Sequence, residues 1–323
     1  MYLVNYLLHT DKFYPAFEII FGIELLFIVL TIVVGIIVIT LSCKAVTLHR
    51  LVRLRVAFPI VFALFHAASQ VVVIHEEHFG PSVHAETTPW IIASLIKQFF
   101  FGYMTLIAFI VALDRWVATK AWSWYESGAR STLLFFLLQE LIICSISATI
   151  AILYVFDNIT AFGSYYCFAG QGITGAICFF FVFRCNLSEM RELKKGAVIN
   201  KYCVAKIYQI KENISVLKSY IQIARPLIAV GAPPFIFILV YMVVPPNVGL
   251  DGLRLFSAAL FELWLTIASF VMICLVPCYF PQLTRPMEKF SKRGSSIAPI
   301  AEIEKNTPEA GDAYFTMLAR EWA

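Results

Sequence analysis

Three ionisable side chains stand inside long apolar stretches of the sequence, where a charge is costly and by default marks a candidate functional site. They are Glu24, Lys97 and Glu262, each five to seven residues from one end of its stretch. A rise of about 1.5 Å per helical residue places all three at one depth, roughly 8–11 Å below that end. A lysine at this depth requires a partner, and Glu262 is the first choice and Glu24 the second. We expect a Lys97–Glu262 ion pair that restrains a resting state and is loosened by a bound molecule. A purely structural pair, or a lysine that reaches outward, is the alternative.

A second polar pair inside the apolar stretches consists of His66 and Gln70. The two residues are four apart and therefore share one face of a helix. A buried hydrogen-bonded pair is favoured, and His66 is also a candidate for the ligand site. Glu140, in another apolar stretch, has no partner that the sequence indicates.

The remaining reactive residue types do not indicate an enzyme. His75, Glu76, Glu77 and His78, with His84 nearby, form a cluster of metal-ligand types. A zinc-protease helix needs His-Glu-x-x-His, which this run does not match, so a solvated loop is favoured. The sequence holds neither a Gly-x-Ser-x-Gly turn nor a Walker-type phosphate loop. It therefore predicts no enzymatic activity, no cofactor and no metal.

The chain as a whole is too apolar for a soluble domain. Of its 323 residues, 60% are hydrophobic and 14% are charged, against about 45–50% and about 25% in soluble proteins. A bilayer core needs about 20 mostly apolar residues in a helix. Seven stretches meet this need, at approximately Ile19–Ser42, Val56–His75, Trp90–Leu113, Thr132–Phe156, Ser164–Cys185, Tyr220–Val244 and Leu255–Phe280. The predicted fold is an all-α membrane protein, a seven-transmembrane helix bundle over residues 19–280, with an extracellular segment at 1–18 and a cytoplasmic tail at 281–323.

The distribution of basic residues predicts the orientation of this bundle. With the N-terminus outside, the segments that face the cytoplasm carry 20 Lys and Arg and those that face outward carry 2. Cytoplasmic loops collect Lys and Arg, so we expect the N-terminus outside and the C-terminus in the cytoplasm. Because the basic residues lie between apolar spans, the lipid bilayer is the expected surrounding and nucleic-acid binding is not expected.

Two motifs lie at the cytoplasmic ends of the predicted spans. The third span ends in LDRWVAT at 113–119, followed by WYE at 124–126. This resembles the E-R-x-x-A-T…Y-E signature of nematode serpentine chemoreceptors of the Sra superfamily. The third inner loop reads YQIKENI at 208–214 and VLK at 216–218, which is similar to the R-Y-Q-x-x-E-N-I-x-x-L-K run of the serpentine receptor class epsilon (Sre) family. With the seven-span layout, the chain resembles an Sre G-protein-coupled receptor.

The resemblance implies a chemosensory function. Such a receptor detects an environmental small molecule, activates a heterotrimeric G protein, and lies as a multi-pass protein in the plasma membrane of chemosensory neurons. Asp114 would hold Arg115 at rest, and Arg115 would exchange partners when the G protein enters; an ion pair that only anchors the helix end is the alternative. The coupling residues carried over from the motifs are Asp114, Arg115, Tyr125, Glu126, Tyr208, Gln209, Glu212 and Asn213. A seven-helix ligand-gated channel or transporter is the alternative function.

The stretch before the sixth span predicts a helix that continues out of the membrane. Apolar residues recur there at three- and four-residue spacing, with Glu212 on the far face, namely Ile207, Ile210, Ile214, Leu217 and Ile221. A receptor needs such a lever, and a helix lying on anionic lipid is the alternative. Within the span, Pro233 and Pro234 remove two backbone donors and are the expected hinge of the helix. A helix irregularity without function is the alternative.

The tail is expected to begin with a short amphipathic helix. Leu283, Met287 and Phe290 have helical spacing and are accompanied by basic residues, which is typical of a helix on the membrane surface. Residues 294–323 are polar and are expected to be disordered.

Overall fold

A computed structural model describes residues 14–45, 50–79, 88–121, 124–125, 130–195, 201–244, 250–280 and 283. The chain divides into two units, Met1–Thr284 and Arg285–Ala323. The second unit lies outside the described residues. Of the predicted tail helix only Leu283 is described, and its side chain is buried.

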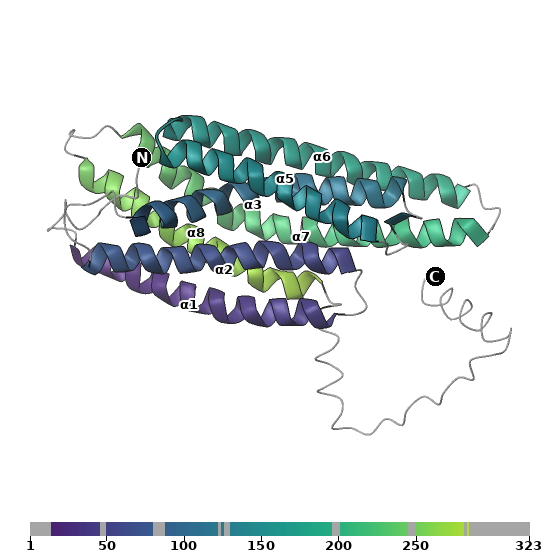
Figure 1. The fold of residues 1–323 in the computed structure, drawn as a ribbon, viewed down its shortest axis with the longest axis horizontal. Helices are drawn as coiled ribbons and strands as arrows, with labels where there is room; N and C mark the ends of the chain where they lie inside the picture. Colours follow the sequence, from purple (N-terminus) through teal and green to yellow (C-terminus); the bar gives the residue numbers. More distant parts are fainter. Residues whose placement is uncertain are drawn as a thin grey trace, which may run out of the picture. The chain divides into compact units, whose positions relative to one another are not determined.

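The described part of the first unit consists of long helices (Figure 1). They are α1 (Tyr14–Lys44), α2 (Arg50–Phe79), α3 (Thr88–Lys120), α5 (Arg130–Val155), α6 (Ala161–Lys195), α7 (Lys201–Val243) and α8 (Asp251–Tyr279). Each contains a segment long and apolar enough to span a membrane, and no strand occurs among the described residues. The predicted all-α fold with seven spans is therefore confirmed. Six of the helices begin within a few residues of the predicted spans, and α7 begins much earlier.

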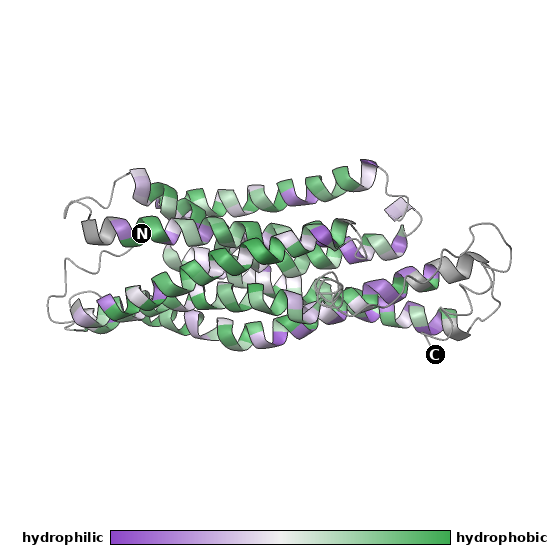
Figure 2. Ribbon diagram, turned by 90° about the horizontal axis from the view of Figure 1, so that it is seen from below, coloured by the Kyte–Doolittle hydropathy of each residue, from purple (hydrophilic) through white to green (hydrophobic). Residues whose placement is uncertain are grey.

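The helices bury their polar side chains and expose apolar ones, because lipid rather than water surrounds a transmembrane bundle. Large apolar side chains such as Ile19, Leu134 and Ile177 are more than half exposed. Figure 2 shows apolar residues along the middle of the helices and hydrophilic ones gathered toward one end. The polar side chains lie in the bundle interior, so the groups that can bind a ligand or exchange partners are found there.

Helix α3 is the central element of the bundle, since it contacts α2, α5, α6 and α7. Two glycines allow α3 to lie close to α5 and α6. A Cβ on Gly175 of α6 would lie 3.0 Å from the backbone nitrogen of Phe109, and one on Gly102 of α3 would lie 3.4 Å from the Cα of Ser147 in α5. Because α3 carries both Lys97 and Arg115, this central position links the two candidate sites.

Helix α7 runs without interruption through Pro226, Pro233 and Pro234. Its first part confirms the predicted extension before the sixth span. The middle of the apolar stripe is buried, with Ile210 and Leu217 almost fully so, and its two ends, Ile207 and Ile221, are partly buried. A salt bridge of 2.8 Å joins Lys206 to Glu189 of α6, so the extension packs against the bundle.

One detail of the predicted extension is wrong. Glu212 is half-buried rather than on the outer face, and it interacts electrostatically with Arg115. The apolar stripe alone does not predict the burial of Glu212. The polar residues Gln209 and Asn213 are also buried, so the buried face of α7 is wider than the stripe.

Candidate functional site

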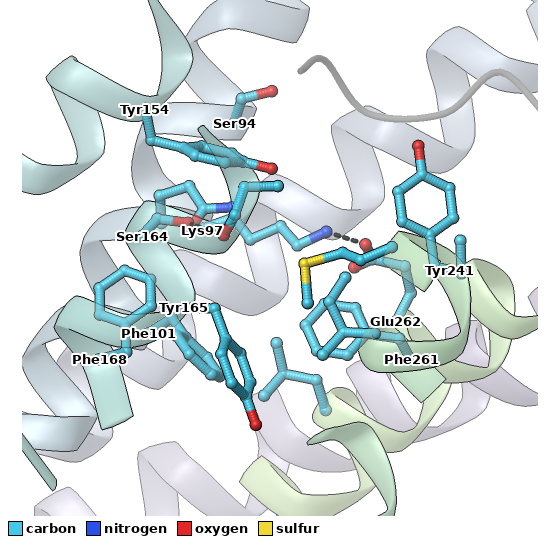
Figure 3. A pocket seen from close by; sticks show the side chains of 16 residues that line it. Ser94, Lys97, Phe101, Tyr154, Ser164, Tyr165, Phe168, Tyr241, Phe261 and Glu262 are labelled. Atoms are coloured by element: carbon cyan, nitrogen blue, oxygen red, sulfur yellow. Dashed lines mark hydrogen bonds and ion pairs between the residues drawn. The ribbon is translucent and has the colours of Figure 1, made fainter. Parts of the chain in front are cut away.

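A cavity of about 100 Å³ lies beside Lys97, between five helices (Figure 3). Its walls come from α3, α5, α6, α7 and α8 and combine aromatic rings with a few polar groups. Lys97 of α3 and Glu262 of α8 form an ion pair in this wall, and both residues are buried. The expected ion pair is present, and it is with Glu262 rather than Glu24.

Neighbouring polar groups hold both carboxylates of this region. Gln70 of α2 donates a hydrogen bond from Nε2 to Oε2 of Glu262 over 2.9 Å. Glu24 of α1 accepts one from Oγ1 of Thr266 over 3.2 Å and lies outside the cavity lining. Hydrogen bonds and the ion pair therefore join α1, α2 and α3 to α8, so a displacement of α8 at Glu262 would disturb three other helices.

His66 does not form the hydrogen-bonded pair with Gln70 that the sequence favours. Gln70 donates to Glu262 instead, and neither ring nitrogen of His66 has a hydrogen-bond partner among the described residues. The buried imidazole stacks on Phe100, with 4.6 Å between ring centroids, and lies outside the cavity lining. The four-residue spacing indicates a shared face but not the neighbours that α3 and α8 supply.

Phe101 of α3 connects the helices around the cavity. Its ring centroid lies 4.9 Å from that of Phe168 in α6, 6.0 Å from that of Phe235 in α7 and 6.4 Å from that of Phe261 in α8. Each such aromatic contact contributes about 0.5–1.5 kcal/mol beyond the buried area. A molecule that moves Phe101 therefore acts on three helices at once.

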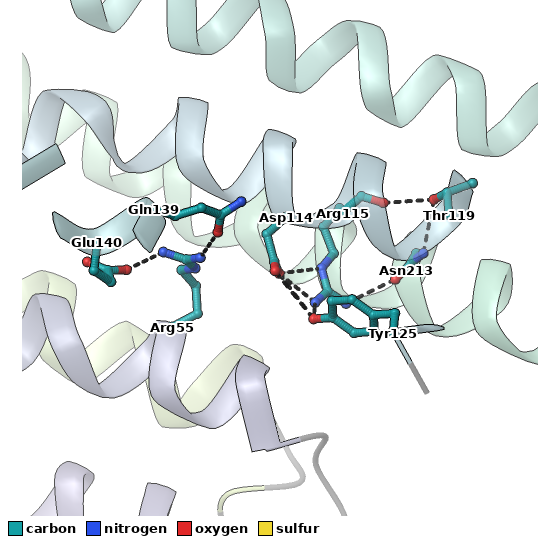
Figure 4. A network of polar contacts seen from close by, with 8 residues as sticks. All are labelled: Arg55, Asp114, Arg115, Thr119, Tyr125, Gln139, Glu140 and Asn213. Atoms are coloured by element: carbon teal, nitrogen blue, oxygen red, sulfur yellow. Dashed lines mark hydrogen bonds and ion pairs between the residues drawn. The ribbon is translucent and has the colours of Figure 1, made fainter. Parts of the chain in front are cut away.

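A second polar site surrounds Arg115, about 27 Å from Lys97 along α3. The guanidinium is 1% exposed and donates to Oδ2 of Asp114 over 2.6 Å, to Oδ1 of Asn213 over 2.9 Å and to the Tyr125 hydroxyl (Figure 4). Its centre lies 5.3 Å from the centroid of the Tyr125 ring. The buried charge is thus satisfied by a carboxylate of its own helix and by two acceptor oxygens from elsewhere in the chain, those of Asn213 and Tyr125.

Asn213 connects this site to two further helices. Its Nδ2 donates to Oγ1 of Thr119 over 3.0 Å, and the Thr119 hydroxyl lies 2.8 Å from Oδ1 of Asn186 in α6. Helices α3, α6 and α7 therefore meet in one chain of hydrogen bonds. A movement of α7 away from α3 breaks the Arg115–Asn213 and Thr119–Asn213 bonds together.

The structure brings together most of the coupling residues that the resemblance indicated. Asp114, Arg115, Tyr125 and Asn213 are in direct contact, and Gln209 is buried one helical turn before Asn213. Glu126 and the side chain of Tyr208 lie outside the described residues. The contacts fit the expected resting arrangement of Asp114 and Arg115, whose role in coupling stays a prediction.

Arg55 is a residue of this region that sequence reasoning missed. It lies in α2 and is 3% exposed; it forms an ion pair with Glu140 of α5, donates to Oε1 of Gln139 over 2.6 Å, and stacks on the Phe136 ring at 4.4 Å. Tyr103 donates to Glu140 over 3.0 Å. Arg55 is therefore the partner of Glu140 that sequence reasoning did not find. The signal of this pair in the sequence is Arg55 itself, a charged residue that stands next to the predicted start of the second span.

One comparison with known protein families gives a match. The model of a family described as Sre G protein-coupled chemoreceptor matches residues 82–323, which include α3 through α8 and both candidate sites apart from the residues of α1 and α2. A search of curated proteins found no match.

Proposed function

The chain belongs to the Sre G protein-coupled chemoreceptor family, and from this premise we propose that it binds a small molecule at the Lys97–Glu262 cavity and activates a heterotrimeric G protein at the Arg115 site. The observation that carries the proposal is the pair of buried polar sites about 27 Å apart on one central helix. The seven apolar helices among its described residues make it a multi-pass membrane protein. Its proposed location is the plasma membrane of chemosensory neurons.

The Lys97 cavity is suited to a ligand because it is lined by apolar rings and a few polar groups that are able to orient a molecule. Ser94 lines this cavity, is 7% exposed, and has a hydroxyl with no hydrogen-bond partner among the described residues. Glu24 and His66, which lie outside the lining, would act on the ligand only through Glu262, Lys97 or Phe100.

The Arg115 site is suited to a switch because its contacts cross between helices. Arg115 is tied to α7 through Asn213, and α7 continues beyond the span as a helix from Lys201. An outward swing of α7, with Pro233 and Pro234 as the hinge, would free the guanidinium and open a surface between α3, α6 and α7. A G protein that binds there would stabilise the swung state by population shift.

The proposal requires that the Arg115 end faces the cytoplasm. We would express the full chain in cultured cells with an epitope tag at each terminus, stain intact and permeabilised cells, and record dissociation of co-expressed G proteins against a small-molecule library. The expected result is an N-terminal tag visible on intact cells and G-protein dissociation with some compounds. An N-terminal tag visible only after permeabilisation, or surface expression without dissociation of any G-protein class, would overturn it.

A further inference from the structure

A second cavity, of about 180 Å³, lies next to the first and is lined by α3, α7 and α8. Its walls are apolar except for two hydroxyl groups. Oγ1 of Thr105 donates within α3 or to Gln171, and Oγ of Ser269 donates to the carbonyl of Leu265 over 2.9 Å. Because both hydroxyl protons are already engaged, the cavity offers water few partners. An enclosed apolar cavity of about 150 Å³ accepts a benzene-sized molecule, and this one, which is partly open, is suited by its volume to about six apolar carbons.

Phe101 and Leu265 line both cavities. These two residues lie where the cavities adjoin, and side chains of this size change rotamer without unfolding a helix. The cavity beside Lys97 and the cavity beside Thr105 are therefore neighbouring compartments, one with charged and polar groups and one without. A single molecule with a polar head and an apolar tail matches both when Phe101 turns aside.

The polar compartment offers two donor groups to an anionic head, one of which, Lys97, the head takes over from Glu262. Lys97 and Ser94 lie three residues apart on α3 and share one face, and together they offer an ammonium and a hydroxyl donor to a carboxylate. When the ligand carboxylate replaces Glu262 as the partner of Lys97, Glu262 keeps the hydrogen bond that Gln70 donates from Nε2. The displaced carboxylate therefore retains a buried donor.

We propose that the ligand of this site is an amphiphilic organic acid, whose carboxylate binds Lys97 and Ser94 and whose apolar chain or ring passes Phe101 into the second cavity. The inference rests on the proposed chemoreceptor function and names the chemical class of its ligand. Gly231 and Pro234 line the second cavity, so the tail contacts α7 at its expected hinge. The head breaks the Lys97–Glu262 pair while the tail presses on α7.

The test is direct binding to the purified full chain, without a G protein. The protein is held in detergent micelles, and its melting temperature is measured with increasing concentrations of straight-chain carboxylates from butanoate to decanoate. Methyl esters and primary amines of the same chain lengths control for partition of the compounds into the micelle. We expect the carboxylates to stabilise the protein, with affinity rising about fourfold per methylene until the second cavity is full and falling beyond that length. Equal binding by the amines or esters, or affinity without an optimal chain length, would overturn the proposal.

Variants locate the head and the tail separately. Lys97→Gln should abolish binding of acids of every length, and Lys120→Gln, at the other end of α3, should leave it intact. Ser94→Ala should weaken every acid by about tenfold. Ala268→Leu, which fills the second cavity, should shift the optimum to shorter acids, and Met104→Ala should shift it to longer ones. An optimum that does not move in either variant places the tail elsewhere and overturns the assignment.

The binding measurement separates this inference from the proposed function. Acids that bind with an optimal length but cause no G-protein dissociation would overturn the function and leave the ligand class standing. Dissociation caused by other compounds, with no binding of acids, would overturn the ligand class and leave the function standing.

Discussion

The indole of Trp264 in α8 donates a hydrogen bond of 2.5 Å to the backbone carbonyl of Val230 in α7. In a regular helix this carbonyl would accept from the amide of residue 234, but that residue is proline and has no N–H. Trp264 therefore satisfies an acceptor that the proline leaves open. The bond ties α8, two residues from Glu262, to the expected hinge of α7.

The first prediction concerns this bond. Trp264→Phe keeps an aromatic ring and removes the donor, so the Val230 carbonyl loses its partner at a cost of about 1–3 kcal/mol. We expect a lower melting temperature. Because the hinge is released, basal G-protein dissociation should also rise, about fivefold for each ~1 kcal/mol by which the bond favours the resting state. Tyr166→Phe, which removes a donor at an exposed position of α6, is the control. Unchanged basal activity with reduced stability would show that the bond is structural only.

The second prediction concerns Asp114. Asp114→Asn removes the carboxylate that faces Arg115 and leaves a side chain of the same shape, so the guanidinium is freer to leave its buried contacts. Basal G-protein dissociation should rise by at least about tenfold, since the loss of a charged hydrogen bond of about 1.5–3 kcal/mol favours the released state. Arg115→Gln should abolish coupling while surface expression continues. Coupling that persists in Arg115→Gln would contradict the role of Arg115.

The third prediction concerns the Arg55–Glu140 pair. Removal of one partner leaves a buried charge and is expected to cost about 3–5 kcal/mol, whereas replacement of both by apolar residues of similar size is near neutral. Arg55→Met and Glu140→Leu should therefore each lower the melting temperature strongly, and the double variant should recover most of the loss. Additive losses in the double variant, measured by thermal unfolding in micelles, would mean that the two side chains do not interact.

The elements were predictable from the sequence because a transmembrane helix is specified locally. Each span needs about 20 apolar residues, and no long-range pairing has to be known. The Lys97–Glu262 pair was also predictable, since equal depth in the bilayer reduces the search for a partner to a few intramembrane carboxylates. Equal depth alone does not rank Glu262 ahead of Glu24, and it is the packing of α3 against α8 that pairs Lys97 with Glu262.

The missed contacts depend on how the helices are rotated against one another. Arg55 stands at a span boundary, where the pattern cannot distinguish a loop residue from the buried partner of Glu140. His66 and Gln70 share a face, but the neighbouring helices place Glu262 beside Gln70 and Phe100 beside His66. Periodicity identifies a face, and only packing identifies what the face meets.

The fourth prediction tests whether the Lys97–Glu262 pair restrains the resting state. Lys97→Gln and Glu262→Gln each leave one buried charge without this partner, so both should raise basal G-protein dissociation as well as lower stability. The double variant restores neutrality, and its melting temperature should recover by a coupling energy of more than about 1 kcal/mol, while its basal activity stays high because no ion pair holds α3 to α8. Basal activity that remains at the starting level in all three variants, with the stability losses present, would make the pair a structural one. Lys97→Gln that changes neither basal nor ligand-driven signalling would exclude the restraint altogether.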